Sequence, residues 1–158
     1  MIGFNHLGRH GRLGNQMFQY AGLRGIAAKH GYEFCIPASD FKDEWTDHQL
    51  FEAFKLTGLT NIATCPGPYV QEASFKFDQN LFDNMPDGHN VYAYLQSTKY
   101  FEHIEKEIRE DFQFKNNILD PCKQMVATVE KPIALHVRRG DYLVNSDNHP
   151  PCSKEYYD

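Results

Sequence analysis

The first 36 residues constrain the possible fold more than any other part of the chain. They hold an apolar segment (residues 1–7), a loop with three glycines, a helical stretch from Asn15 to about His30 and a second apolar segment (residues 32–36). Apolar side chains cover most of the helical stretch, which is typical of a buried helix, and Gly31 is placed to end it. We expect Asn15 to cap its amino end, because its side-chain oxygen can accept from the free amides of a first turn. Strand, glycine-bearing loop, helix and strand predict the start of an α/β layered domain.

The same patterns predict further elements along the chain. Residues 38–88 indicate loops and short elements, with a helix near Asp47–Lys55, and Val91–Leu95 indicates a strand. Helices are expected over Tyr100–Phe112, where apolar residues recur at four-residue steps, and over Pro121–Val129. Two pairs of opposite charge at i,i+4 spacing should support the first of these helices: Glu102 with Lys106, and Glu105 with Arg109.

A compact apolar run, Pro132–Val137, predicts a buried parallel strand that ends abruptly in Arg138-Arg139-Gly140-Asp141. Ligands of open α/β sheets bind beyond the carboxyl ends of the strands. Paired arginines follow both the first predicted strand and this last one. We therefore expect a ligand to bind at one or both of these places.

The charge pattern favours a small anionic ligand over a polymer. The formal net charge is -5, and no stripe of lysine and arginine runs along any predicted helix. A nucleic-acid-binding protein needs such basic side chains to displace counterions from the phosphates, so this class is disfavoured. The clustering of Arg9 with Arg12 and of Arg138 with Arg139 instead indicates a discrete anion.

The cysteines and the amino terminus indicate a reducing compartment. The 4 cysteines are far apart and form no CxxC pair, so zinc ligation is poorly supported and small buried thiols are expected. The chain shows no basic leader followed by an apolar stretch, and no run of about 18 apolar residues. The expectation is a soluble, cytoplasmic protein.

Two loops carry residues suited to binding chemistry. In Gly11-Arg12-Leu13-Gly14-Asn15-Gln16, glycines let the backbone approach a ligand and the following helix offers free amides to an anion; a tight turn with a capped helix is an equally good reading. In His136-Val137-Arg138-Arg139-Gly140-Asp141-Tyr142, the arginines provide paired, permanently charged donors for phosphate oxygens. A surface turn in which Asp141 pairs with an arginine, and a hydrogen-bonded core histidine at position 136, are the alternatives there.

Taken together, these segments resemble a known family. Residues 11–21, GRLGNQMFQYA, are similar to the amino-terminal signature of the α-1,2-fucosyltransferases of glycosyltransferase family eleven. Residues 136–142 resemble the HxRRxD motif shared by α-1,2-, α-1,6- and protein-O-fucosyltransferases, residues 94–101 resemble the QSxKYF stretch, and residues 152–157 resemble the segment that normally follows. The four similarities occur in the family's order along nearly the whole chain.

The resemblance implies an α/β fold of the GT-B type, in which two Rossmann-like lobes face each other and GDP-fucose lies mainly on the carboxyl-terminal one. Residues 1–130 would form the acceptor-side lobe, and residues 131–158 would begin the nucleotide-binding lobe, which in the family continues for a further hundred-odd residues. The reaction implied is metal-independent transfer of L-fucose, with inversion, to a galactose 2-hydroxyl of a glycan. A lipid-linked acceptor would bring such an enzyme to a membrane surface.

The same resemblance implies roles for individual residues. Arg138 would be the catalytic residue that grips the diphosphate, with His136, Arg139 and Asp141 placing the donor. From the opposite lobe, three residues of the glycine loop would reach the sugar-phosphate side: Arg12, Gly14 and Asn15. Arginine can neutralise the charge that a departing GDP gains, as a metal ion does in other transferases.

Three rival interpretations stay open. Arg9-His10-Gly11 after the first predicted strand suggests a histidine phosphatase, although such enzymes carry a hydroxyl residue where Leu13 stands. A dinucleotide-binding half is disfavoured because the glycine spacing is not GxGxxG. An inactive fragment or a carbohydrate-binding module is the remaining alternative.

Overall fold

The computed structural model describes residues 1–38, 48–137, 139–144, 146–147 and 150–157. It divides into two compact units, Met1–Asp120 and Pro121–Asp158. The lobe boundary predicted at residues 130 and 131 stays a prediction, because a division into compact units does not identify the lobes of a glycosyltransferase.

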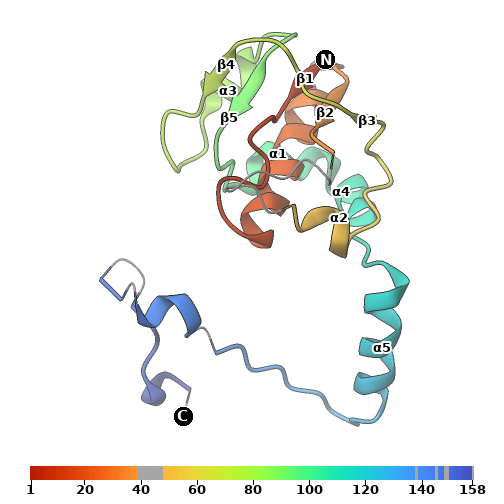
Figure 1. Ribbon diagram of the computed structural model, residues 1–158, viewed down its shortest axis with the longest axis vertical. Helices are drawn as coiled ribbons and strands as arrows, with labels where there is room; N and C mark the ends of the chain where they lie inside the picture. The colour runs from red at the N-terminus through yellow and green to blue at the C-terminus, as the bar shows by residue number, and fades with distance from the viewer. Residues whose placement is uncertain (39–47, 138, 145, 148–149, 158) are drawn as a thin grey trace. The chain divides into compact units, whose positions relative to one another are not determined.

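The first unit is built on a five-stranded parallel sheet in the order β3-β2-β1-β5-β4 (Figure 1). The strands are short: β1 (Ile2–Gly3), β2 (Phe34–Ile36), β3 (Asn61–Ile62), β4 (Tyr69–Gln71) and β5 (Asn90–Tyr92). The predicted α/β class is therefore confirmed, and the parallel sheet is compatible with a Rossmann-like glycosyltransferase fold. Strand β1 leads through a helix to β2 on one side, while β5 and β4 lie on its other side, so the strand order reverses between β1 and β5. Ligands of open α/β sheets bind at such a reversal, beyond the carboxyl ends of the strands.

The first helix, α1 (Leu13–His30), is the central packing element of this unit, as predicted. It ends at Gly31, whose φ of 69° lies in the left-handed region that favours glycine, and whose amide donates to carbonyls of the last turn. The core joins α1 to the sheet and contains the fully buried side chains of Ile2, Phe4, Tyr20, Leu23, Ile26, Val91, Leu95 and Tyr100.

The amino end of α1 differs from the prediction. The helix begins at Leu13, Arg12 occupies the N-cap position without a side-chain cap bond, and Asn15 lies inside the first turn. Asn15 was therefore wrongly predicted as the cap. The side chain at position 49 replaces it, because Gln49 Oε1 accepts from the Leu13 amide at 2.8 Å.

Shorter helices complete the first unit: α2 (Leu50–Ala53), α3 (Gln79–Asn84) and α4 (Glu105–Asp111). The single helix predicted over Tyr100–Phe112 is divided, because 3-10 turns at Thr98–Tyr100 and Glu102–Ile104 precede α4. The predicted Glu105–Arg109 ion pair is present at 2.7 Å, whereas within the described part of the chain no ion pair joins Glu102 to Lys106. Of the helix predicted over Asp47–Lys55, Asp47 lies outside the described residues.

Close contact between residues 100–103 and the backbone of α1 explains why the predicted helix is divided. A Cβ at Gly25 would overlap the Tyr100 carbonyl oxygen and lie 2.9 Å from Phe101 Cα, and His103 Nε2 lies 3.1 Å from the Gly25 carbonyl oxygen. Segment 98–104 thus follows the surface of α1 instead of its own helical preference, since tertiary contacts override local propensity.

We expect Gly25→Ala to lower the free energy of unfolding by about 1–3 kcal/mol, the usual cost of overpacking a tight core. The backbone atoms that the new methyl group would meet cannot move aside as a flexible side chain does. Urea denaturation measures the change. Gly14→Ala is the matched control, because a Cβ at Gly14 meets nothing within 4 Å; equal stability of the two variants would contradict the expectation.

Two elements predicted in the second unit, a helix and a strand, differ from those observed. Helix α5 (Asn116–Ala127), which begins in the first unit, starts before Pro121 and includes it, instead of beginning there. The buried strand predicted over Pro132–Val137 is wrong: these residues form no strand, and Ile133 and Leu135 are 95% and 69% exposed. A strand needs a neighbour for its backbone hydrogen bonds, and no strand is present among the residues described beyond Asp120.

Candidate binding site at the carboxyl edge of the sheet

The loop between β1 and α1, residues 4–12, carries the first group of candidate residues. Gly8 and Gly11 have φ angles of 86° and 93°, a conformation in which L side chains are strained. A Cβ at Gly11 would also overlap the Asn15 side chain, coming 2.6 Å from its Cγ. These two glycines allow the chain to fold back over the start of α1.

Two buried glutamines of α1 hold this loop in place, and the sequence analysis missed both. Gln19 Nε2 donates to the His10 carbonyl at 2.9 Å, while Gln16 Nε2 lies 3.4 Å from the Gly11 carbonyl oxygen and Gln16 Oε1 accepts from the Gln49 amide at 2.9 Å. Both glutamines are 0% exposed. The signal was available, because a glutamine on the apolar face of a helix needs a buried hydrogen-bond partner.

The glycine loop contacts residues 94–101 through Asn15 and Gln96, which are 81 positions apart in the sequence. Gln96 Nε2 donates to Asn15 Oδ1 at 2.7 Å. A Cβ at Gly22 would come 2.8 Å from Leu95 Cβ, and Leu95 itself has a φ of 52°. The two segments that carry the family resemblance in the first unit are therefore joined directly.

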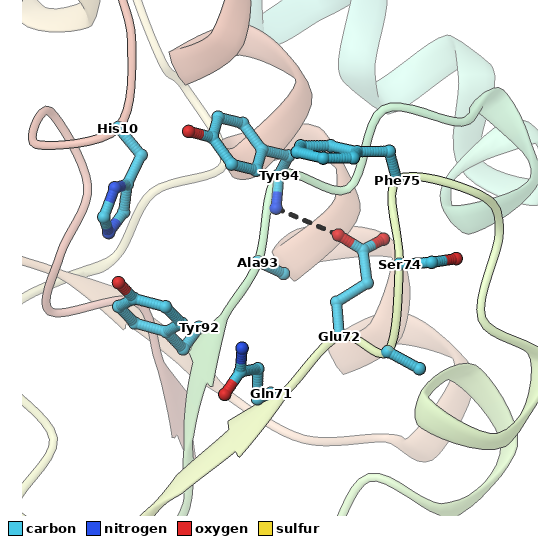
Figure 2. A pocket seen from close by; sticks show the side chains of 9 residues that line it. His10, Gln71, Glu72, Ser74, Phe75, Tyr92, Ala93 and Tyr94 are labelled. Atoms are coloured by element: carbon cyan, nitrogen blue, oxygen red, sulfur yellow. Dashed lines mark hydrogen bonds between the residues drawn. The ribbon is translucent and has the colours of Figure 1, made fainter.

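A cavity of about 270 Å³ opens beside this loop, over the carboxyl ends of β4 and β5. Figure 2 shows His10 on one side of it and Glu72, Ser74 and Phe75 on the other, with Tyr92 and Tyr94 between them. The cavity therefore lies at the edge of the sheet where parallel α/β folds bind their ligands.

Glu72 fixes the shape of this edge. Its side chain is buried and accepts from the Tyr94 and Leu95 amides at 3.0 and 3.2 Å and from the Tyr100 hydroxyl at 2.9 Å. Burial raises the pKa of Tyr100 above its ordinary value, and the bond to Glu72 raises it further. Tyr100 therefore stays protonated and keeps donating, so Glu72 acts as a clamp between the ends of β4 and β5.

His6 and His10 lie next to each other on the loop and pack against Tyr92. Their ring centroids are 5.3 and 4.9 Å from that of Tyr92. Burial lowers the pKa of both histidines, and the positive charge of Arg9 lowers each further. His6 Nδ1 and His10 Nε2 are buried without a hydrogen-bond partner within the described part of the chain.

These histidines should make stability depend on pH. Their folded pKa lies below the unfolded value of 6.5, so the unfolded state takes up protons first and the free energy of unfolding falls as the pH drops below that value. We expect His10→Gln to lose less stability than the parent protein between about pH 7.5 and 5.5. Urea titrations at both pH values measure this. The exposed His136 gives the control, His136→Gln, which should keep the parental slope; equal slopes in all three proteins would contradict the expectation.

The predicted site residues fall into two groups. Arg12, Gly14 and Asn15 lie together at the start of α1, where Arg12 and Gly14 are exposed. His136 and Arg139 are exposed in the second unit, the Asp141 backbone lies in a 3-10 turn (Gly140–Leu143), and Arg138 lies outside the described residues. The roles predicted for these seven residues stay predictions.

Two further observations concern metal ions and membranes. No group of three or more His, Cys, Asp or Glu side chains in the described ranges is arranged to hold a metal ion. Among the helices of the described part, none combines the length and apolar character needed to cross a bilayer.

Comparisons with known proteins point in one direction. The chain is 27% identical over 151 residues to galactoside alpha-(1,2)-fucosyltransferase 1 of Homo sapiens, with 84% of this chain and 38% of that protein covered. It is 24% identical over 143 residues to galactoside alpha-(1,2)-fucosyltransferase 2 of Hylobates lar, covering 84% of the chain and 40% of the relative. An alpha-1,2-colitosyltransferase of Escherichia coli is 25% identical over 173 aligned positions, with 93% of the chain and 59% of the relative covered.

These similarities support a relationship to the fucosyltransferases and a glycosyltransferase function. No family model and no solved structure matches the chain. The chain spans about 40% of the length of the mammalian relatives.

Proposed function

We propose that this chain forms the acceptor-side lobe, and the beginning of the donor-side lobe, of a GT-B glycosyltransferase that moves L-fucose from GDP-fucose to a galactoside 2-hydroxyl with inversion. The observation that carries the proposal is the direct bond between Asn15 and Gln96. It joins the glycine loop to residues 94–101 at the carboxyl edge of the sheet, and both segments are ones in which the chain resembles α-1,2-fucosyltransferases.

The chemistry requires little more than positioning and charge. The acceptor hydroxyl attacks the anomeric carbon of fucose on the face opposite the phosphate, the bond to GDP breaks, and the hydroxyl proton passes to a base. The departing diphosphate gains negative charge. Fixed guanidinium groups stabilise that charge better than mobile ones, because they need no reorganisation during the reaction. In this proposal, Arg138 and Arg139 supply the charge from one lobe and Arg12 from the other, without a metal ion.

The test uses protein expressed from the complete reading frame, incubated with GDP-fucose and lactose. We expect GDP release together with a fucosylated product whose anomeric configuration is inverted, read by NMR. Product formation from GDP-mannose as fast as from GDP-fucose would contradict the donor assignment, and absence of any glycosyl product would contradict the function. Hydrolysis of a phosphate monoester that is lost in His10→Ala would instead favour the phosphatase interpretation.

Gly14 allows the binding role of the loop to be separated from its stability. Because a Cβ at Gly14 meets no atom within 4 Å, packing does not require a glycine there, and alanine in a helix is favoured over glycine by up to about 1 kcal/mol. We expect Gly14→Ala to be at least as stable as the parent but to lose about fivefold in kcat/KM for GDP-fucose, about 1 kcal/mol. An unchanged kcat/KM would show that no substrate comes close to Gly14.

A further inference from the structure

We propose that the cavity beside His10 is a saccharide subsite that holds one pyranose ring of the acceptor. The name of the sugar, a galactoside, rests on the proposed function, whereas the binding of an uncharged sugar ring rests on the cavity itself. Its volume of about 270 Å³ lies just below the range of about 300–1,000 Å³ usual for drug-sized ligands. A single ring is therefore a better fit than a whole nucleotide sugar.

Aromatic rings form the walls of the cavity. Phe75 is 70% exposed although it is a large apolar side chain, and its ring lies 5.2 Å from that of Tyr94, tilted by 46°. Tyr92 contributes a further ring, which packs edge-on against His10. The C–H face of a pyranose is apolar and weakly positive, so it packs favourably against the negative face of an aromatic ring.

Polar atoms around the opening suit sugar hydroxyls. His10 lines the cavity, and its Nε2 is buried without a hydrogen-bond partner among the described residues. Such an unpaired atom costs stability, and a sugar hydroxyl reaches it when the ring turns toward the cavity. A neutral imidazole can pair with a hydroxyl as donor or as acceptor. The exposed side chains of Gln71 and Ser74 add donors and acceptors at the rim. A few polar groups around an apolar floor are the usual composition of a small-molecule site.

The charge of the lining favours a neutral ligand. None of the 9 lining residues is a lysine or an arginine, and the one charged residue among them is Glu72. Among the lining residues, a diphosphate would meet a carboxylate and no cation; Arg9, whose charge acts on His10, is not part of the lining. The cavity therefore differs from the arginine-bearing positions assigned to the donor.

The cavity is also held rigidly, which lowers the entropic cost of binding. Glu72 clamps the Tyr94 and Leu95 amides. Asp78, three residues after Phe75 in the sequence, holds the other end of this loop. Its Oδ2 accepts from the Ala73 amide at 3.0 Å, and its Oδ1 accepts from the Leu81 amide at 3.0 Å. The loop that carries Phe75 is thus closed at its base, and the exposed ring stands on a fixed frame.

The test is an NMR titration of the full chain with methyl β-D-galactopyranoside, compared with a titration with GDP. We expect saturable shifts at His10 and Tyr94, and an affinity about tenfold weaker in Phe75→Ala, equivalent to about 1.4 kcal/mol. Phe75 is exposed enough that its removal should leave the fold intact. Phe114→Ala is the matched control, because Phe114 is an exposed aromatic residue (44%) of the same unit that does not line the cavity, and its affinity should equal that of the parent.

Three results would overturn the subsite: no saturable shift at His10 and Tyr94, unchanged affinity in Phe75→Ala, or stronger shifts of the same residues with GDP. Turnover separates the subsite from the proposed function. If the galactoside binds as expected and no fucose is transferred, the proposed function fails alone. If fucose is transferred and Phe75→Ala leaves the acceptor KM unchanged, the subsite fails alone.

Discussion

Replacement of Asp111 by alanine is expected to lower the free energy of unfolding by about 3–5 kcal/mol, the usual result of breaking a buried ion pair from one side. The Asp111 side chain is 1% exposed and forms an ion pair with Arg24. It also accepts from the Tyr20 hydroxyl at 2.6 Å, from Thr57 Oγ1 at 3.1 Å and from the Gly58 amide at 2.6 Å. One carboxylate therefore joins helix α1, the segment after α2 and the end of α4.

The expected loss of stability comes from the hydrogen-bond donors that would lose their acceptor. Without Asp111, the Tyr20 hydroxyl stays buried without its acceptor, and Arg24, whose side chain is 17% exposed, keeps a charge without a partner carboxylate. Burial raises the pKa of Tyr20 and remains in the variant, so the hydroxyl does not escape this cost by ionising. Gly58 contributes as well, since a Cβ there would overlap the Arg24 guanidinium.

Thermal and urea unfolding measure the effect, and the midpoint temperature should fall by on the order of 10 °C. The exposed Asp120 gives the matched control: Asp120→Ala should stay within about 0.5 kcal/mol of the parent. Tyr20→Phe, which removes one donor and leaves the ion pair, should cost about 1 kcal/mol. A loss below about 1 kcal/mol in Asp111→Ala would show that the network does not stabilise the fold.

Replacement of Arg138 by alanine is the change expected to affect activity most. If Arg138 grips the diphosphate as proposed, kcat/KM for GDP-fucose should fall more than tenfold, a loss above about 1.4 kcal/mol. Arg138→Lys should be nearly as damaging, because a compact ammonium cannot reproduce the paired donors of a guanidinium. Steady-state kinetics of protein from the complete reading frame measure both variants.

The control for Arg138 is Arg109→Ala. Arg109 is an arginine with a 76% exposed side chain on α4, paired with Glu105, and nothing places it near a substrate. Its kcat/KM should match that of the parent. If Arg138→Ala keeps more than a tenth of the parental kcat/KM, the role assigned to Arg138 is contradicted.

The sequence predicted the first part of the fold well because its signals there are local. The buried face of α1 follows from the apolar residues of the helix, and its end at Gly31 follows from the freedom of glycine at positive φ. The order of strand, loop, helix and strand then leaves few alternatives to a parallel α/β sheet. The predictions that were wrong concern residues whose conformation depends on distant neighbours. Pro132–Val137 has the composition of a buried strand, yet a strand depends on pairing that composition does not reveal.

In the candidate site, too, local features could be predicted from the sequence and long-range contacts could not. That Arg12, Gly14 and Asn15 lie together could be predicted from the sequence, because they are neighbours at the start of one helix. The chemical groups available for binding could also be listed from it. In contrast, the bond of Gln96 to Asn15, the bonds of Glu72 at the end of β5 and the cavity shared by Phe75 and His10 are known from the folded structure alone. These residues are tens of positions apart, and a contact at that range depends on the packing of the whole sheet, which no local pattern contains.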